Sequence, residues 1–349
     1  MKTSLKTKQI SIDFNPKPIV KRLLSALPSR AQDIISGRFG LNGDKKMTLE
    51  AIGKKYGITR ERVRQIENYS IGNIRRSSVY EKEKSYFEEL KSVIRKLGGI
   101  ISEEDLLTHI SKDKSLQNNI HFMLIIGEDF VKEKEDEEFK HRWHIDKELA
   151  SKIHEGLRKL YSGLKDDEIV PESEIVSSFL DHIKDVSQEY KDEEIIGRWL
   201  KMSRALGKNP LGEWGKSKSS NISARGIRDY AYLVIRRHGS PIHFREVARL
   251  ISEIFNKKAH VATTHNELIK DERFVLVGRG LYALKEWGYS MGIVRDVIKD
   301  ILKKNGPLSK EKVVEKVLKE RYVKENTIVV NLQNPKNFKK LKDNTYTLA

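Results

Sequence analysis

Four polar residues between positions 60 and 65 have the side-chain types and the spacing needed to read base pairs. They are Arg60, Glu61, Arg64 and Gln65. The guanidinium of an arginine can donate hydrogen bonds to both O6 and N7 of guanine. A glutamine amide can hydrogen-bond N6 and N7 of adenine, and a glutamate carboxylate can accept from N4 of cytosine. We therefore expect these four residues to contact bases in the major groove of duplex DNA.

The surrounding residues predict a helix-turn-helix that positions this polar face. Thr48 and Thr59 can each cap a helix through the hydroxyl, and Gly57 can supply the left-handed residue that ends the first helix. The apolar residues expected to face inward are Leu49, Ile52, Tyr56, Val63, Ile66 and Ile74. The alternative, a solvated charged helix that contacts nothing, is less favoured because the short helix, the glycine turn and the capped start occur in the right order.

Residues 27–76 resemble region 4 of the primary-type sigma factors of bacterial RNA polymerase. The matching strings are Leu27-Pro-Ser-Arg30, Arg38-Phe-Gly-Leu41, Thr48-Leu-Glu-Ala-Ile-Gly53 and Thr59-Arg-Glu-Arg-Val-Arg-Gln-Ile-Glu67. The resemblance implies that the second helix enters the major groove of a promoter −35 element. It also implies a docking contact with the β flap of RNA polymerase. Residues expected by resemblance to lie against the DNA backbone are Arg30, Arg38, Thr48, Leu49 and Arg62.

The sequence departs from that family in two respects. The stretch before Leu27 is too short for the region that melts the −10 element, and nothing downstream resembles it. Tyr69 also stands where the family often has a basic residue. We therefore expect a regulator of transcription initiation rather than a complete sigma factor.

A second resemblance covers residues 223–286. The strings Gly239-Ser-Pro-Ile-His-Phe-Arg-Glu-Val247 and Gly278-Arg-Gly-Leu-Tyr-Ala-Leu284 resemble a HARE-type winged helix, a family that includes the N-terminal domain of the RNA polymerase delta subunit. The two strands around Gly278-Arg-Gly280 also predict a β-hairpin from their own pattern. This second resemblance again points to transcription, although such modules also accompany restriction and chromatin proteins.

Four stretches share the order of three helices followed by a strand pair, which predicts a mainly α fold with tandem winged-helix-like domains and small β-hairpin wings. For the middle pair, unrelated helical hairpins remain an alternative. The expected division is a flexible basic arm (1–18), the helix-turn-helix (19–79), a winged-helix-like domain (80–146), a divergent one with a linker (147–221), the HARE-type domain (222–287) and a C-terminal winged-helix-like domain (288–349).

The charge distribution agrees with a polyanionic partner. The chain has 349 residues and a formal net charge of +17, which favours nucleic acid. The basic excess lies in residues 19–77 and 222–349, whereas residues 78–221 are acidic overall. Only the two ends therefore have the charge expected of a DNA footprint, and the middle is better suited to a spacer or to protein contacts.

Several functional classes are excluded or disfavoured. The absence of cysteine excludes disulfides, thiolate metal sites and cysteine nucleophiles. No apolar run approaches the length of a membrane span, and no signal peptide is evident, so we expect a cytoplasmic protein. The histidines near His141 and His144 lack convincing metal spacing, and Gly278 and Gly280 are not followed by a phosphate-loop lysine. We expect no enzymatic activity, cofactor, bound metal or small-molecule substrate.

Two other functions remain open at this stage. The protein could be an accessory factor of RNA polymerase whose modules act mainly by protein docking. It could also be the DNA-specificity component of a restriction or defence system. Double-stranded DNA and bacterial RNA polymerase are the partners that the sequence favours.

Overall fold

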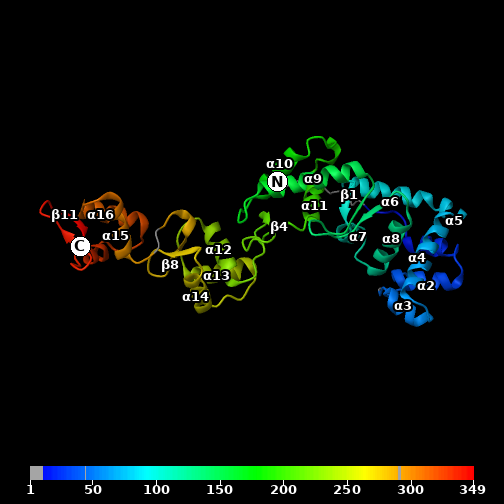
Figure 1. Ribbon diagram of the computed structural model, residues 1–349, viewed down its shortest axis with the longest axis horizontal. Coiled ribbons are helices and arrows are strands. Elements are labelled where there is room, and N and C mark those ends of the chain that lie inside the picture. Colours follow the sequence, from blue (N-terminus) through cyan, green and yellow to red (C-terminus); the bar gives the residue numbers. More distant parts are fainter. Residues whose placement is uncertain (1–10, 44, 290–291) are drawn as a thin grey trace, which may run out of the picture. The chain divides into compact units, whose positions relative to one another are not determined.

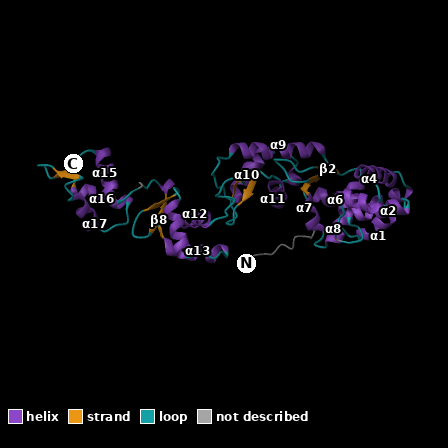
Figure 2. Ribbon diagram, turned by 60° about the horizontal axis from the view of Figure 1, so that its bottom comes forward, coloured by secondary structure: helices purple, strands orange, loops and turns teal. Residues whose placement is uncertain are grey.

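The computed structural model describes residues 11–43, 45–289 and 292–349, which form two compact units (Figure 1). The first unit extends to Asp166 and also includes Val170–Gly207 and Trp214–Ser217. The second contains Asp167–Ile169, Lys208–Glu213 and Lys218–Ala349. Helices dominate both, and the strands are short and form small antiparallel sheets (Figure 2). The prediction of a mainly α fold with small hairpins is confirmed.

The first unit begins with four helices: α1 (Pro16–Leu24), α2 (Ser29–Phe39), α3 (Leu49–Tyr56) and α4 (Arg60–Arg75). Helix α1 starts inside the segment 1–18 that we expected to be a flexible arm, of which residues 1–10 lie outside the described part. Asn15 caps α1 by accepting from the Lys17 amide at 3.1 Å. Pro16 and Pro18 therefore open a helix, because a proline in the first turn removes no intrahelical hydrogen bond.

The rest of the first unit contains two copies of the expected order of three helices and a strand pair, except for Lys208 at the end of β4, which belongs to the second unit. The first copy comprises α6 (Lys84–Lys96), α7 (Glu103–Ile110), α8 (Lys114–Ile126), β2 (Val131–Glu133) and β3 (Arg142–His144). It follows the short helix α5 (Ser78–Lys82), and β1 (Ile100–Ser102) completes its sheet in the order β1-β3-β2. The second comprises α9 (Lys147–Gly163), α10 (Glu172–His182), α11 (Glu193–Met202), β4 (Leu206–Lys208) and β5 (Trp214–Lys216).

One apolar core joins α1, α2 and α4 to the copy that follows them. It contains buried residues from Ile19 of α1 to Trp143 of β3. Helix α8 is central to it, because Phe122, Met123 and Leu124 are all fully buried. The packing is therefore continuous across residues 79 and 80, where the sequence motifs change.

The second unit repeats the same order twice. Its first copy comprises α12 (Ile227–His238), β6 (Ile242–His243), α13 (Phe244–Phe255), α14 (Val261–Lys270), β7 (Phe274–Leu276) and β8 (Leu281–Leu284). Its second comprises α15 (Val294–Asn305), β9 (Leu308–Ser309), α16 (Lys310–Glu320), α17 (Glu325–Leu332), β10 (Phe338–Lys340) and β11 (Thr345–Leu348). Val275 pairs with Ala283 in the antiparallel hairpin that the sequence indicates. In the described ranges, no helix has the length and hydropathy needed to cross a bilayer.

Candidate nucleic-acid interface

Helices α3 and α4 form the helix-turn-helix, and local capping fixes both of their starts. The Thr48 hydroxyl accepts from the Ala51 amide at 3.1 Å, and the Thr59 hydroxyl accepts from the Arg62 amide at 3.1 Å. Gly57 ends α3 in the left-handed region, with φ of 65°. The threonine caps satisfy amide groups that the first turn of a helix leaves unpaired, so these three residues define where α3 begins and ends and where α4 begins.

Gly53 allows the turn to pass close to α3. A Cβ at this position would lie 2.6 Å from the carbonyl oxygen of Ile58. That separation is shorter than any non-bonded carbon–oxygen contact, so only glycine permits this close approach. Gly53 therefore fixes how closely the turn that leads into α4 packs on α3.

A small apolar cluster holds the two helices against α2. Ile34, Ile52 and Val63 are its buried members, and Leu49, Tyr56 and Ile66 pack against them. Leu49 thus points toward the protein, so only its backbone amide at the start of α3 is suited to a phosphate contact. The Thr48 hydroxyl, which accepts from Ala51, still has its own hydrogen to donate.

The opposite face of α4 carries the four residues expected to read bases. Arg60, Glu61, Arg64 and Gln65 are all exposed. Glu61 and Arg64 bind each other, with 2.7 Å between Oε1 and Nη2 and 2.9 Å between Oε2 and Nε. This contact lowers the pKa of Glu61 and raises that of Arg64. Arg62 donates from Nη1 to Gln65 Oε1 at 3.1 Å. This face of α4 is therefore exposed to solvent, and its side chains hydrogen-bond one another.

The two flanking arginines have different surroundings. Arg30 is exposed and donates from Nη2 to the Tyr56 carbonyl at 3.3 Å. Arg38 is one-third exposed and donates from Nε to Glu67 Oε2 at 3.0 Å. A phosphate approaching Arg38 would compete with the Glu67 carboxylate, whereas one approaching Arg30 would compete only with a neutral carbonyl.

Helix α8 supports the helix-turn-helix through contacts with the end of α4 and the end of α2, and the sequence patterns did not indicate this. Arg75, at the end of α4, donates to the carbonyls of Ile126 at 2.8 Å and Ile125 at 2.9 Å. Asn118 donates to the carbonyl of Gly40 at 3.2 Å. The only signal in the sequence was the apolar run that starts at Phe122, which suggests a helix buried on several sides.

Two histidines of the first unit, His144 and His154, lie in a buried network around Arg142. Arg142 donates from Nε to His154 Nε2 at 2.8 Å and also binds Glu133 and Asp136. His144 lies 3.2 Å from Glu133 Oε1. The acidic run 133–138 covers the end of β2 and the exposed loop between β2 and β3, and within it Glu133, Asp136 and Glu138 form ion pairs with Arg142 and Arg158.

Comparison with known proteins identifies the N-terminal module. Residues 23–76 match the family model of sigma-70, region 4. RNA polymerase sigma factor SigA of Clostridium acetobutylicum is 37% identical over 67 residues, which are 19% of this chain and 18% of that protein. SigA of a Bacillus species is 36% identical over 72 residues (21% and 19%), and RpoS of Coxiella burnetii is 45% identical over 56 residues (16% and 16%).

These matches cover less than a fifth of the length of the sigma factors. Residues 23–76 form a sigma-70 region 4 module, as the resemblance implied. The likeness of residues 223–286 to HARE-type winged helices stays a prediction.

Proposed function

We propose that this protein binds double-stranded DNA sequence-specifically through its sigma-70 region 4 module and regulates the initiation of transcription. The observation that carries the proposal is the exposed face of α4, where Arg60, Glu61, Arg64 and Gln65 project from the first turns after a capped start. Recognition helices read bases with their N-terminal residues.

In this proposal the residues around that face have separate roles. The four exposed side chains of α4 contact base edges in the major groove. Arg30 and Arg62 bind phosphates by charge, while Thr48 and the Leu49 amide bind phosphate at the start of α3. Arg38 contributes after it exchanges Glu67 for a phosphate. Phosphate contacts set the register of the protein on the duplex, and base contacts set its sequence preference.

We further propose that the module contacts bacterial RNA polymerase, with the β flap as the docking partner. Supporting this is an apolar groove of about 540 Å³ between α2 and α4. Leu27, Ala31 and Ile66 line it, beside Tyr69, which is 69% exposed. An apolar groove between two helices suits the apolar face of a partner helix.

The test is selection of bound sequences from a random duplex pool by the full chain, followed by binding measurements at two salt concentrations. We expect an enriched sequence, and tighter binding to it than to scrambled duplex at both salt concentrations. If the selected pool shows no sequence preference, DNA reading by α4 is refuted. Strong binding to RNA polymerase would then favour the second candidate, an accessory factor that acts by protein docking, which the acidic residues 78–221 also suit.

A further inference from the structure

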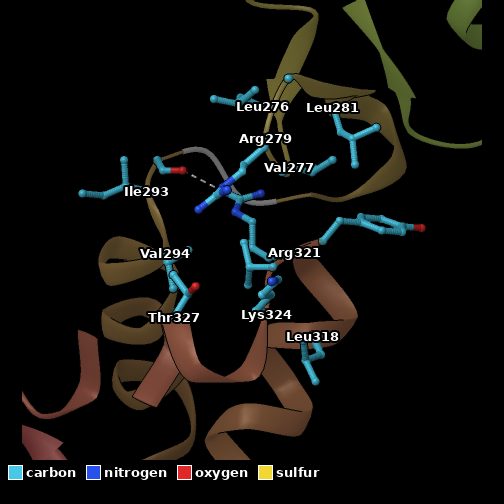
Figure 3. A pocket seen from close by; sticks show the side chains of 15 residues that line it. Leu276, Val277, Arg279, Leu281, Ile293, Val294, Leu318, Arg321, Lys324 and Thr327 are labelled. Atoms are coloured by element: carbon cyan, nitrogen blue, oxygen red, sulfur yellow. Dashed lines mark hydrogen bonds between the residues drawn. The ribbon is translucent and has the colours of Figure 1, made fainter. Parts of the chain in front are cut away.

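A groove in the second unit, far along the sequence from the helix-turn-helix, has the properties of a peptide-binding site. It has a volume of about 820 Å³ and lies between the turn of the β7–β8 hairpin and the segment that follows α16 (Figure 3). We call it the hairpin groove. Its lining residues come from positions 276–281, 292–294 and 318–327.

Backbone contacts hold the two sides of the hairpin groove together. The Tyr322 amide donates to the Val277 carbonyl at 2.8 Å, and Gly278 pairs with Tyr322 in a parallel bridge. A Cβ at Gly278 would lie 2.8 Å from the Tyr322 carbonyl oxygen, so glycine is required there. Arg321 donates from Nη2 to the Gly292 carbonyl at 2.9 Å. These contacts therefore join the two sides of the groove within the second unit.

The walls of the groove are unusually apolar for a surface. Ten large apolar side chains are exposed among the described residues, and four of them line this groove. They are Leu276, Ile293, Leu318 and Tyr322, which are 49%, 59%, 44% and 54% exposed. A cluster of this kind marks an interaction site more often than isolated exposed apolar residues do.

The charges in the groove all have the same sign. Arg279, Arg321 and Lys324 line it, and none of its described lining residues is acidic. In Figure 3 these three side chains are drawn among the apolar side chains Leu276, Ile293 and Leu318. Arg321 is 2% exposed, and burial lowers its pKa. Arg321 donates to the backbone carbonyls of Glu320 and Gly292, and the exposed cations Arg279 and Lys324 line the same groove, so the approach of a carboxylate would stabilise this group of like charges.

We propose that the hairpin groove binds a short segment of a partner protein in which a carboxylate lies beside large apolar side chains. The carboxylate would bind Arg279, Arg321 or Lys324, and the apolar side chains would cover Leu276, Ile293 and Leu318. This goes beyond DNA reading by α4 and does not depend on it.

Two observations favour a peptide over nucleic acid as the occupant. The walls are mainly aliphatic, with Tyr322 as the aromatic member, whereas grooves for single strands use successive aromatic rings for stacking. The turn of the β7–β8 hairpin, which would approach a duplex if it acted as a wing, packs against Tyr322 instead.

The experiment pans a random dodecapeptide library against the full chain and then measures the fluorescein-labelled form of the most enriched peptide by anisotropy. We expect enriched peptides to carry Asp or Glu within two positions of Leu, Ile or Phe. Leu318→Ser and Lys324→Glu should each raise the Kd at least about tenfold, since each removes one of the two proposed contacts. Both side chains are exposed, so the fold should survive, and an unchanged thermal melt checks this.

Matched controls are Val330→Ser, which is 60% exposed outside the groove, and Lys340→Glu on β10; neither should change the Kd. The proposal is overturned if no enriched peptide depends on Leu318, or if acidic residues are not enriched. It is also overturned if a thymidylate single strand of about 20 nucleotides binds more tightly than the peptide and depends on Leu318 and Lys324. All four variants should keep the sequence preference of the unmodified chain for duplex DNA, because that preference is assigned to α4, and this separates the result from the test of α4.

Discussion

The carboxylate of Glu61 binds the guanidinium of Arg64 on the exposed face of α4, with 2.7 Å between Oε1 and Nη2. Both side chains are 57% exposed. Exposed ion pairs of this kind contribute little to stability, so this one can separate at low free-energy cost. Before DNA binds, the pair keeps two proposed base-reading groups oriented along the same side of the helix. Each can then exchange its partner for a base edge.

Replacing Arg64 by alanine should relax sequence preference while leaving the fold intact. A good bidentate contact to a base discriminates by about 1–3 kcal/mol. The Kd for the selected sequence should therefore rise, and the Kd for scrambled duplex should change much less. Competition binding with both duplexes measures the ratio. Arg158→Ala is the matched control, because Arg158 of α9 forms a comparable exposed pair with Glu138 of the loop between β2 and β3. An equal loss of affinity for both duplexes would show that Arg64 contacts the DNA backbone instead of a base.

Replacing Lys45 by alanine should weaken binding to all sequences alike. Lys45 is exposed just before α3, so its expected partner is a phosphate. Each lost phosphate contact reduces the slope of log K against log salt by about 0.9 for duplex DNA. Neighbouring Lys46 is also exposed but lines a cavity together with Glu103, whose carboxylate already attracts its ammonium, so Lys46→Ala should change the slope less. The slope measured from 50 to 200 mM salt tests this, and Lys159→Ala on α9 should leave it unchanged.

The contacts that the sequence predicts well at this site are short-range. Thr48, Gly57 and Thr59 act on residues three or four positions away, and their chemistry alone specifies caps and a left-handed turn. The inward positions of Ile52 and Val63 follow from helical periodicity in the same way. These local rules determine which side of α4 is exposed, and so which residues can contact DNA.

The support for the site could not be predicted, because it joins residues distant in the sequence. Arg75 and Ile126 are 51 positions apart, and Asn118 and Gly40 are 78 apart. No pattern within one segment specifies such partners. The hairpin groove has the same origin, since its wall combines an exposed Leu276 with an exposed Leu318 that look unremarkable separately.

Lowering the pH from 7 toward 4 should destabilise the first unit through His154. Burial, followed by the charge of Arg142, lowers the pKa of His154 from 6.5 to about 4. The neutral ring also accepts the hydrogen bond from Arg142. Between these two pKa values the unfolded chain binds the proton and the folded protein does not, so stability falls as the pH drops from about 6.5 to about 4.

The loss attributable to His154 should be roughly 2 kcal/mol across that range. Urea unfolding at pH 7 and pH 4.5 measures it, and His154→Gln should flatten the dependence because glutamine can still accept from Arg142 without titrating. The groups that face His154 include Glu133, Arg158 and His144, so the comparison must be made between the variant and the unmodified chain at both pH values. An equal pH dependence in both proteins would exclude His154 as the cause.

Alanine should have opposite effects at two helical glycines. At Gly197 in α11 a Cβ would meet nothing within 4 Å, so Gly197→Ala should stabilise the protein by up to about 1 kcal/mol through helix propensity. At Gly53 the Cβ would lie 2.6 Å from the Ile58 carbonyl oxygen. The turn before α4 must then shift, and Gly53→Ala should destabilise by about 1–3 kcal/mol despite the same propensity gain. Urea midpoints give both changes in stability.

Because the shift displaces Thr59 and the start of α4, Gly53→Ala should also reduce affinity for the selected duplex more than for scrambled DNA. If Gly53→Ala instead stabilises the chain as Gly197→Ala does, the close packing of α3 on the turn is wrong, and with it the position assigned to the base-reading face.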